Sequence, residues 1–358
     1  MSNLFDVAVL VPVYNAADWL DYCFDSIARQ NIGDLSVCIS IWNDGSTDNS
    51  SVVIKAWIPT FKKKGLEVYY GENKSASPAG VGAAKNVCVR ACRSRTLLFQ
   101  DADDVMLPGR ITAQYRLLQS CLVHSTYVLI GSRFRREPEE STVRFTRWAN
   151  SLTEAELLTQ RFTSHGPTVI APTWCCNRKL FDAIGGFEEH SAGFPEDLAF
   201  FYSAIRLRAC LRRCNEELLI YRYLKSSATF SVNEQTIWDI RVKEFEKQII
   251  EPMWSQTTGF TIWSAGKQGR RFYRSLKPSL QRVVMAFCDV DDKKIKQGYY
   301  EYALASTSGP KPRIPIVHFS QAKPPFVICV KLDLTNGAFE KNLASLNLTD
   351  GVDYFHFS

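Results

Sequence analysis

The sequence lacks any apolar run long enough to cross a membrane. The run nearest the N-terminus, Val7–Val13, is far shorter than the roughly 18 residues that a membrane-spanning helix needs. The first residues also lack a basic leader followed by a small-residue cleavage site, which argues against a secretory signal peptide. We therefore expect a soluble, cytoplasmic protein.

Cysteine spacings typical of zinc sites and redox motifs are also missing. The chain has 11 cysteines, but the adjacent pair Cys175–Cys176 fits neither pattern. An odd number of cysteines, spread over hydrophobic segments, predicts reduced thiols in a cytosolic protein. The net charge of +6 is mild, so it permits a polyanionic partner without demanding one.

The pattern of elements predicts an α/β protein with two domains, because 358 residues exceed one ordinary core. Short strand-like runs alternate with helical periodicity in the first hundred residues, which predicts a parallel, doubly wound sheet. In such a sheet ligands bind at the carboxyl ends of the strands. Asn15, Asp44 and Asp101 follow strand ends and should line one crevice. The expected strands are Val7–Val13, Leu35–Trp42, Glu67–Tyr70 and Leu97–Phe99, and the expected helices include Asp18–Arg29 and Gly82–Cys92.

A second alternation of strands and helices begins near Thr261. It predicts a small Rossmann-like α/β domain over residues 258–358, after a catalytic domain over residues 1–240, with the boundary within 235–258. Residues 133–165 look like a connecting or acceptor-facing excursion. The turn from Ser264 to Gly269, with Asp289 further on, approximates a dinucleotide fingerprint. Serine occupies the first glycine position, so we favour a scaffold over an NAD site.

Two carboxylates, Asp101 and Asp103, follow an apolar strand with one residue between them. Hard divalent cations such as Mn²⁺ or Mg²⁺ prefer oxygen ligands, and a diphosphate can supply the rest. The pair could also be part of an ordinary acidic turn or helix cap.

A second acidic pair, Glu196 and Asp197, opens a helical run after a Gly-Gly-Phe turn. An acceptor hydroxyl needs a positioned base to remove its proton, although these residues could merely stabilise the helix N-terminus. Weaker signals are Asp44 in an Asn-Asp-Gly-Ser-Thr-Asp turn and Lys85 in a glycine-rich turn that could face phosphate.

In their order, these motifs resemble those of family 2 glycosyltransferases of the GT-A fold: V-P-V-Y-N, D-G-S-T-D, G-x-x-x-A-K-N, D-x-D-D, G-G-F, E-D and Y-R. The resemblance covers about residues 5–224 and implies inverting transfer from a UDP-sugar. It implies a metal at Asp101 and Asp103, and Asp197 as base supported by Glu196. Donor contacts would come from Pro12, Val13, Asn15, Asp44, Lys85, Asp101 and Ala102. The chain has Asn43 where the family often has aspartate, and Leu224 where many members have a histidine metal ligand.

Basic residues gather in three places, with aromatic residues among them, a composition that suits an RNA backbone and a splayed base. Solvated helix faces are the alternative for each cluster. One of the three clusters consists of the arginines at positions 206, 208, 212 and 213. The candidate RNA-binding residues are Arg133, Arg135 and Arg136 in one cluster, and Lys267, Arg270, Arg271 and Arg274 in another.

Stretches of both halves, including GPTVIAPTWC, FTIWSAGKQGRRFYRSL and PPFVICVKLDLT, also resemble the galactosyltransferases that modify queuosine in tRNA. That resemblance implies UDP-galactose as donor and the cyclopentene hydroxyl of queuosine, at the wobble position of tyrosine tRNA, as acceptor. Composition and spacing indicate neither. Two alternatives stay open: a UDP-N-acetylglucosamine transferase acting on a glycan, and a non-catalytic nucleotide- or RNA-binding protein.

Overall fold

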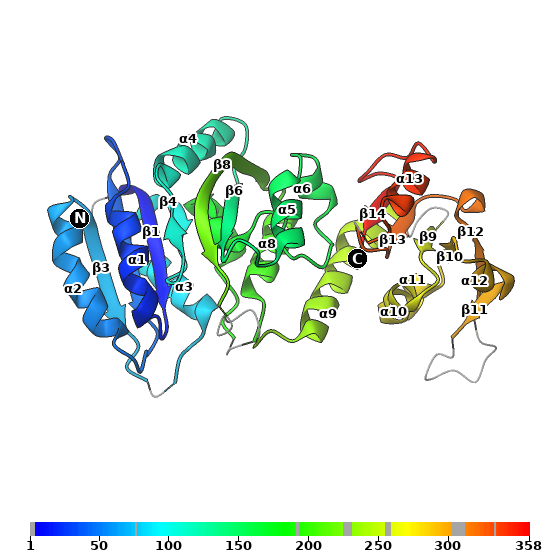
Figure 1. Ribbon diagram of the computed structural model, residues 1–358, viewed down its shortest axis with the longest axis horizontal. Helices are drawn as coiled ribbons and strands as arrows, with labels where there is room; N and C mark the ends of the chain where they lie inside the picture. The colour runs from blue at the N-terminus through cyan, green and yellow to red at the C-terminus, as the bar shows by residue number, and fades with distance from the viewer. Residues whose placement is uncertain are drawn as a thin grey trace. The chain divides into compact units, whose positions relative to one another are not determined.

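The computed structural model describes residues 4–75, 77–190, 193–224, 231–254, 259–302, 312–332 and 334–358. The chain divides into two compact units (Figure 1): Met1–Leu157 with Pro167–Ile237, and Leu158–Gly166 with Trp238–Ser358. The expected first residue of the C-terminal domain, position 258, lies outside the described residues. Among the described helices, none combines the length and apolar character that a membrane crossing requires. All eleven cysteines are free thiols.

The first unit is built on one eight-stranded sheet with the order β3-β2-β1-β4-β7-β6-β8-β5. Its central strands are continuous β-branched and aliphatic runs, because both faces of the sheet are covered. The strands are β1 (Phe5–Val13), β2 (Val37–Asn43), β3 (Glu67–Glu72), β4 (Ser94–Phe99), β5 (Val105–Met106), β6 (Val128–Glu137), β7 (Cys175–Asn177) and β8 (Cys210–Arg222).

The predicted parallel sheet is only half of the observed one. Strands β3, β2, β1 and β4 pair in parallel, whereas β7 is antiparallel to both β4 and β6, and β5 is antiparallel to β8. The sheet is therefore mixed. The strand–helix alternation in the sequence extends only as far as β4, so it could not report the pairing of the later strands.

The expected excursion over residues 133–165 is also partly wrong. Residues 133–137 continue strand β6, which pairs in parallel with β8. Phe134 is fully buried while Arg135 is exposed, so the segment alternates as a strand does. Helices α5 (Val143–Ser151) and α6 (Glu156–Thr159) follow it.

Helices cover both faces of this sheet. Helix α3 packs on β1 and β2, and α1 packs on α2 through the edge-to-face pair Phe24–Phe61, whose centroids are 5.4 Å apart. These contacts fix where each strand delivers its following loop. The helices are α1 (Ala17–Ala28), α2 (Ser50–Lys63), α3 (Val81–Ala91), α4 (Arg110–Leu122), α7 (Arg178–Ile184) and α8 (Glu196–Arg206), with the 3-10 turn η1 (Ala171–Thr173).

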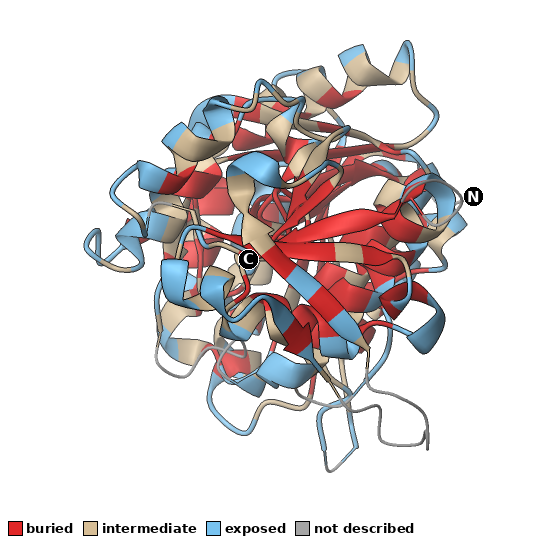
Figure 2. Ribbon diagram, turned by 90° about the vertical axis from the view of Figure 1, so that its right-hand side faces the viewer, coloured by how far each residue is buried: buried red, intermediate tan, exposed pale blue. Residues whose placement is uncertain are grey.

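The second unit has a six-stranded sheet with the order β11-β12-β10-β9-β13-β14, parallel except at β11. Numbered along the chain, its five parallel strands run 3-2-1-4-5, as in doubly wound dinucleotide-binding sheets. Figure 2 shows buried strands at its centre and helices exposed on their outer faces. The strands are β9 (Phe260–Trp263), β10 (Val284–Asp289), β11 (Tyr299–Glu301), β12 (Arg313–His318), β13 (Phe326–Ile328) and β14 (Tyr354–His356).

The described residues of this part of the chain include seven helical segments. They are α9 (Glu234–Phe245), the π-helix η3 (Glu246–Trp254), α10 (Lys267–Ser275), α11 (Pro278–Gln281), α12 (Asp292–Lys296), the 3-10 turn η4 (Phe319–Gln321) and α13 (Ala338–Ala344). Aromatic residues fill the core between several of them. Phe245, for example, packs on Phe272 and Phe357 with centroids 5.6 and 5.5 Å away.

Candidate active site

The loop after β4 presents three carboxylates at the carboxyl edge of the first sheet. Asp101 and Asp103 are half-buried, and Asp104 is fully buried. Burial raises the pKa of Asp103 to about 6, and the neighbouring charge of Asp101 adds to the shift. Burial also raises the pKa of Asp101, against the opposing effect of the Lys85 ammonium. A bound cation or a proton would relieve the repulsion between two such carboxylates.

Asp101 and Asp103 fit a divalent cation in part. Their oxygens are the ligands that Mn²⁺ and Mg²⁺ prefer, and the charge of Asp101 raises the electrostatic cost of ionising Asp103. Within the described ranges, no three His, Cys, Asp or Glu side chains are grouped closely enough to hold a metal ion. Further ligands would have to come from a diphosphate and water, as the absence of a histidine at Leu224 suggests.

Lys85 is paired with Glu196 in the interior. Its Nζ lies 2.9 Å from Glu196 Oε1, and the two side chains are only 8% and 11% exposed. Gly82 allows α3 to pack closely against the segment that contains Glu188 and Glu196. A Cβ at position 82 would collide with the Glu188 carbonyl oxygen. The sequence predicted that Lys85 faces the donor. In the structure its ammonium donates a hydrogen bond to Glu196, and its contact with a donor stays a prediction.

Asp197 lies beside this ion pair at the start of α8. Its Oδ1 accepts a hydrogen bond from Leu198 N at 2.7 Å. Burial raises the pKa of Asp197 to about 6, and the negative charge of Glu196 adds to the effect. The charge of Asp101 also acts on Asp197, so the structure brings the predicted base and the predicted metal carboxylate within electrostatic reach of each other. A carboxylate with a pKa near neutrality is a better base than an ordinary aspartate.

Asp44 and Asn15 hold loops at the same edge. The Asp44 carboxylate accepts hydrogen bonds from Asn73 Nδ2, Ala79 N and Gly80 N at 2.8–3.1 Å. Asn15 Oδ1 accepts from Thr47 N at 2.8 Å. A nucleobase would therefore have to share Asp44 with these partners.

The remaining predicted donor residues differ in exposure. Pro12 is half-buried, Val13 is buried and its carbonyl accepts from Asp44 N at 2.8 Å, and Ala102 is buried in the core. Only backbone groups of Val13 and Ala102 could meet a donor, because their side chains face the interior.

The first basic cluster is less accessible than the sequence suggested. Arg136 is 8% exposed, and its guanidinium lies 3.6 Å from the centre of the Tyr221 ring. Burial and this ring contact leave little of Arg136 open to a ligand, and its contact with RNA stays a prediction. Arg133 is half-buried and Arg135 is exposed.

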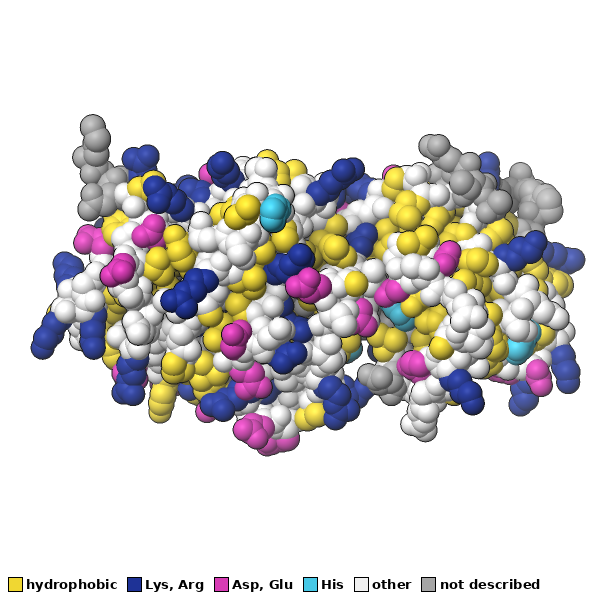
Figure 3. Space-filling view, turned by 90° about the horizontal axis from the view of Figure 1, so that it is seen from above, with side chains coloured by type: hydrophobic (Ala, Val, Ile, Leu, Met, Phe, Trp, Pro, Cys, Tyr) yellow, Lys and Arg dark blue, Asp and Glu magenta, His cyan; other side chains and the backbone are white. Residues whose placement is uncertain are grey.

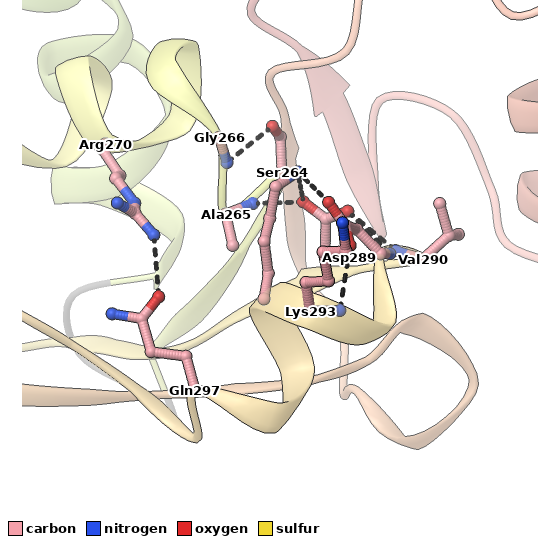
Figure 4. Close-up of polar contacts among 10 residues, drawn as sticks. Ser264, Ala265, Gly266, Arg270, Asp289, Val290, Lys293 and Gln297 are labelled. Atoms are coloured by element: carbon pink, nitrogen blue, oxygen red, sulfur yellow. Dashed lines mark hydrogen bonds and ion pairs between the residues drawn. The ribbon is translucent and has the colours of Figure 1, made fainter.

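In the second unit, the turn after β9 does not fit a dinucleotide (Figure 4). Asp289, at the position that would take ribose hydroxyls, accepts hydrogen bonds from Ala265 N and Lys294 Nζ on one oxygen, and from Val290 N and Asp291 N on the other. Ser264 takes φ 121°, a conformation that favours glycine. The carboxylate is thus saturated by its own loops.

Two of the four basic residues of α10 lie against aromatic rings. Arg270 lies 4.9 Å from the Tyr300 ring and Arg271 lies 4.0 Å from the Trp238 ring. Lys267 and Arg274 are exposed. Sequence reasoning placed all four on one RNA-binding surface, and these two are the ones that a phosphate could reach most easily.

Sequence comparison identifies the first unit. Residues 8–185 match the family described as Glycosyl transferase family 2. The uncharacterized glycosyltransferase EpsJ of Bacillus subtilis is 24% identical over 228 residues, which are 62% of each chain. Chondroitin synthase of Pasteurella multocida is 32% identical over 110 residues, which are 29% of this chain and 10% of that protein. The chain thus spans less than two thirds of these curated relatives.

Solved structures share the fold at low identity. S. aureus TarS 1-349 in complex with UDP-GlcNAc superposes with a TM-score of 0.55 at 13% identity, over 87% of this chain and 99% of that one. The mannosyltransferase PcManGT from Pyrobaculum calidifontis, in complex with GDP-Man and Mn²⁺, gives a TM-score of 0.50 at 17% identity, over 69% and 65%. At these identities both structures support the fold alone.

Proposed function

Because residues 8–185 match Glycosyl transferase family 2, we propose that this chain transfers a sugar from a UDP-sugar to an acceptor hydroxyl with inversion at the anomeric carbon. One observation carries the proposal. Asp197, whose pKa is raised to about 6, lies within electrostatic reach of Asp101 and of the Lys85–Glu196 pair. A base and a cation-binding carboxylate are the two groups that such a displacement requires.

In this reaction the acceptor oxygen bonds to the anomeric carbon while the bond from that carbon to the diphosphate breaks. Asp197 takes the hydroxyl proton, and UDP leaves with the bonding electrons. A divalent cation held by Asp101 and Asp103 would neutralise charge on the leaving diphosphate. Glu196 and Lys85 keep the start of α8 in place, so that Asp197 meets the hydroxyl in one orientation.

For the substrates, we propose UDP-galactose as donor and the cyclopentene hydroxyl of queuosine in tyrosine tRNA as acceptor. The support is the resemblance of both halves of the sequence to queuosine-modifying galactosyltransferases. The carboxylates would hold the cation and the diphosphate, which all UDP-hexoses share, so sugar identity must be tested directly.

The decisive assay offers purified protein a panel of UDP-sugars with queuosine-containing tyrosine tRNA, with and without Mn²⁺. We expect galactose transfer that stops when the metal is chelated. Tyrosine tRNA with guanine in place of queuine is the control, since it lacks the cyclopentene group that carries the acceptor hydroxyl. Transfer of N-acetylglucosamine but not galactose would overturn the donor, and transfer to the control tRNA would overturn the acceptor. If no UDP-sugar is transferred to this tRNA or to a glycan acceptor, the enzymatic proposal is wrong.

We also propose that the second unit, residues 258–358 in the sequence-based division, contributes to tRNA binding through exposed basic residues of α10. Figure 3 shows lysine and arginine side chains scattered over one face of the molecule among acidic ones. Substituting Lys267→Glu and Arg274→Glu should weaken tRNA binding without changing UDP binding. The same charge change at Lys62 and Lys63 of α2, which are also exposed, is the control. Equal tRNA affinities for the two double variants would exclude this surface.

A further inference from the structure

The loop Asp101–Asp104 is held by hydrogen bonds to its backbone carbonyls. Gln100 Nε2 donates to Asp101 O at 2.9 Å and to Asp104 O at 3.0 Å. Arg222 Nη1 donates to Asp103 O at 3.0 Å. The backbone N–H of Arg222 donates to Asp104 Oδ1 at 2.9 Å. Each of these donors belongs to the protein interior, so the loop has little freedom to spread.

Arg110 holds the Gln100 side chain in place through a hydrogen bond. This arginine is fully buried in α4, and its Nη1 donates to Gln100 Oε1 at 2.7 Å. Its Nη2 donates to Phe99 O at 2.8 Å and to Pro172 O at 2.9 Å. Burial lowers the pKa of Arg110 to about 10, so it remains a cation at neutral pH. A charged side chain is rarely buried to this degree unless its hydrogen-bonding groups are paired, as those of Arg110 are here.

Arg222 supports the opposite side of the loop. It is 7% exposed, and its guanidinium lies 5.1 Å from the Trp19 ring and 4.9 Å from the Tyr22 ring, both on α1. Its Nε is 3.3 Å from Glu137 Oε2 on β6. Stacking on α1 and pairing with β6 hold the guanidinium where it meets Asp103.

We propose that Gln100, Arg110 and Arg222 are positioning residues that keep the carboxylates of Asp101 and Asp103 in the arrangement that receives a divalent cation and UDP. This inference rests on the proposed function, because it assumes that these carboxylates bind the cation. The physical reason is repulsion. Like charges at one loop drive it apart when no cation is bound, and two buried guanidinium groups and an amide oppose that movement. Because the loop is already ordered before the cation binds, binding does not have to supply the free energy of ordering it.

The test measures binding, which needs no turnover. Gln100→Leu removes both amide donations while keeping an apolar volume of similar size. Gln30→Leu is a matched control, because Gln30 Nε2 also donates to two carbonyls, Ser26 O and Leu107 O, at 3.2 and 3.0 Å. We expect Gln100→Leu to weaken Mn²⁺–UDP binding about 10- to 100-fold by calorimetry, as is usual when residues behind metal ligands are lost. Gln30→Leu should bind like wild type.

A second pair of variants covers the case in which Gln100→Leu does not fold. Arg222→Met should weaken Mn²⁺–UDP binding similarly, and Arg222→Lys should restore part of it. Arg178→Met is the control, since Arg178 also donates to backbone carbonyls, those of Ser94, Val89 and Cys92. Thermal unfolding midpoints of each variant and its control show whether their stability losses match.

The outcomes separate this inference from the proposed function. If Gln100→Leu or Arg222→Met folds and binds Mn²⁺–UDP within twofold of wild type, the positioning role is overturned. If wild type binds Mn²⁺–UDP but transfers no sugar, the proposed function fails while the positioning role is still decided by the variants. If wild type does not bind Mn²⁺–UDP at all, both are overturned.

Discussion

The two units place an aspartate at the carboxyl edge of a parallel strand and treat it in opposite ways. In the first unit, Asp101 and Asp103 follow β4 half-buried, and burial together with neighbouring negative charge raises the pKa of each. In the second unit, Asp289 ends β10 with four hydrogen-bond donors on its two oxygens. Burial alone would raise the pKa of Asp289, but hydrogen bonds from Lys294, Asp291 and Ala265 outweigh burial and lower it.

This difference in pKa and hydrogen bonding distinguishes carboxylates suited to a binding site from a carboxylate that stabilises the fold. A carboxylate with a raised pKa and an open side gains free energy when a cation or a proton arrives, so it is suited to binding and catalysis. A carboxylate saturated by its own loops gains nothing from a ligand and contributes to stability instead. The shared strand arrangement therefore does not imply a shared function.

The largest expected effect is at the predicted base. Asp197→Asn keeps the shape of the side chain but cannot accept the acceptor proton at neutral pH. We expect kcat for sugar transfer to fall about 100- to 10,000-fold, the usual range for loss of a general base. Initial rates on acceptor RNA measure this, and Mn²⁺–UDP affinity should change little. Full turnover by this variant would remove Asp197 from the reaction.

The next effect concerns stability in the first unit. Lys85→Met leaves the Glu196 charge buried without its partner, so the free energy of unfolding should fall by about 3–5 kcal/mol. Urea denaturation measures it. Adding Glu196→Gln should recover part of the loss by removing the stranded charge. Lys294→Met, at the more exposed pair of the second unit, should cost about 1 kcal/mol. If Lys85→Met and Lys294→Met lower the free energy of unfolding equally, the proposed difference between the two ion pairs is wrong.

A smaller effect is expected at the structural aspartate. Asp289→Ala leaves the amides of Ala265, Val290 and Asp291 without their acceptor, which should cost about 1–3 kcal/mol of stability. Sugar transfer should be unchanged at temperatures where the variant is folded. Because the folded-state pKa of Asp289 is lowered, its stabilisation is present above an unfolded pKa of about 3.9 and is lost as pH falls through the folded value. Thermal unfolding at pH 7 and pH 3 should show the difference from wild type shrinking at the lower pH.

The smallest effect is the pH dependence of the rate. The base must be deprotonated, so kcat should fall about tenfold per pH unit below the Asp197 pKa of about 6. Glu196 raises that pKa, and Glu196→Gln should therefore move the acid limb to lower pH. A pH–rate profile of wild type and variant checks both statements. A limb that stays in place would mean that another group controls the rate.

The fold of the first unit could be predicted as far as β4, because β-branched runs and helical periodicity alternate there. The prediction failed beyond β4, where β7 and β8 join the sheet through long connections that leave no periodic signal. At the site, Asp101 and Asp197 could be recognised from the sequence. Asp101 follows an apolar strand and Asp197 lies at the start of a helix, and both positions can be inferred from neighbouring residues. Arg110, Gln100 and Arg222 did not, because a buried arginine that holds a loop looks like any polar residue in a helix or strand.

The sequence by itself determined which carboxylates follow which strands, because local periodicity and turn residues are properties of neighbouring positions. Only the tertiary structure decided what surrounds each of them. Lys85 and Glu196 are far apart in the chain, and their ion pair exists because α3 packs on α8 at Gly82. Asp289 and Asp101 look alike in sequence, and their pKa values move in opposite directions because the donors around a side chain are set by packing between distant segments.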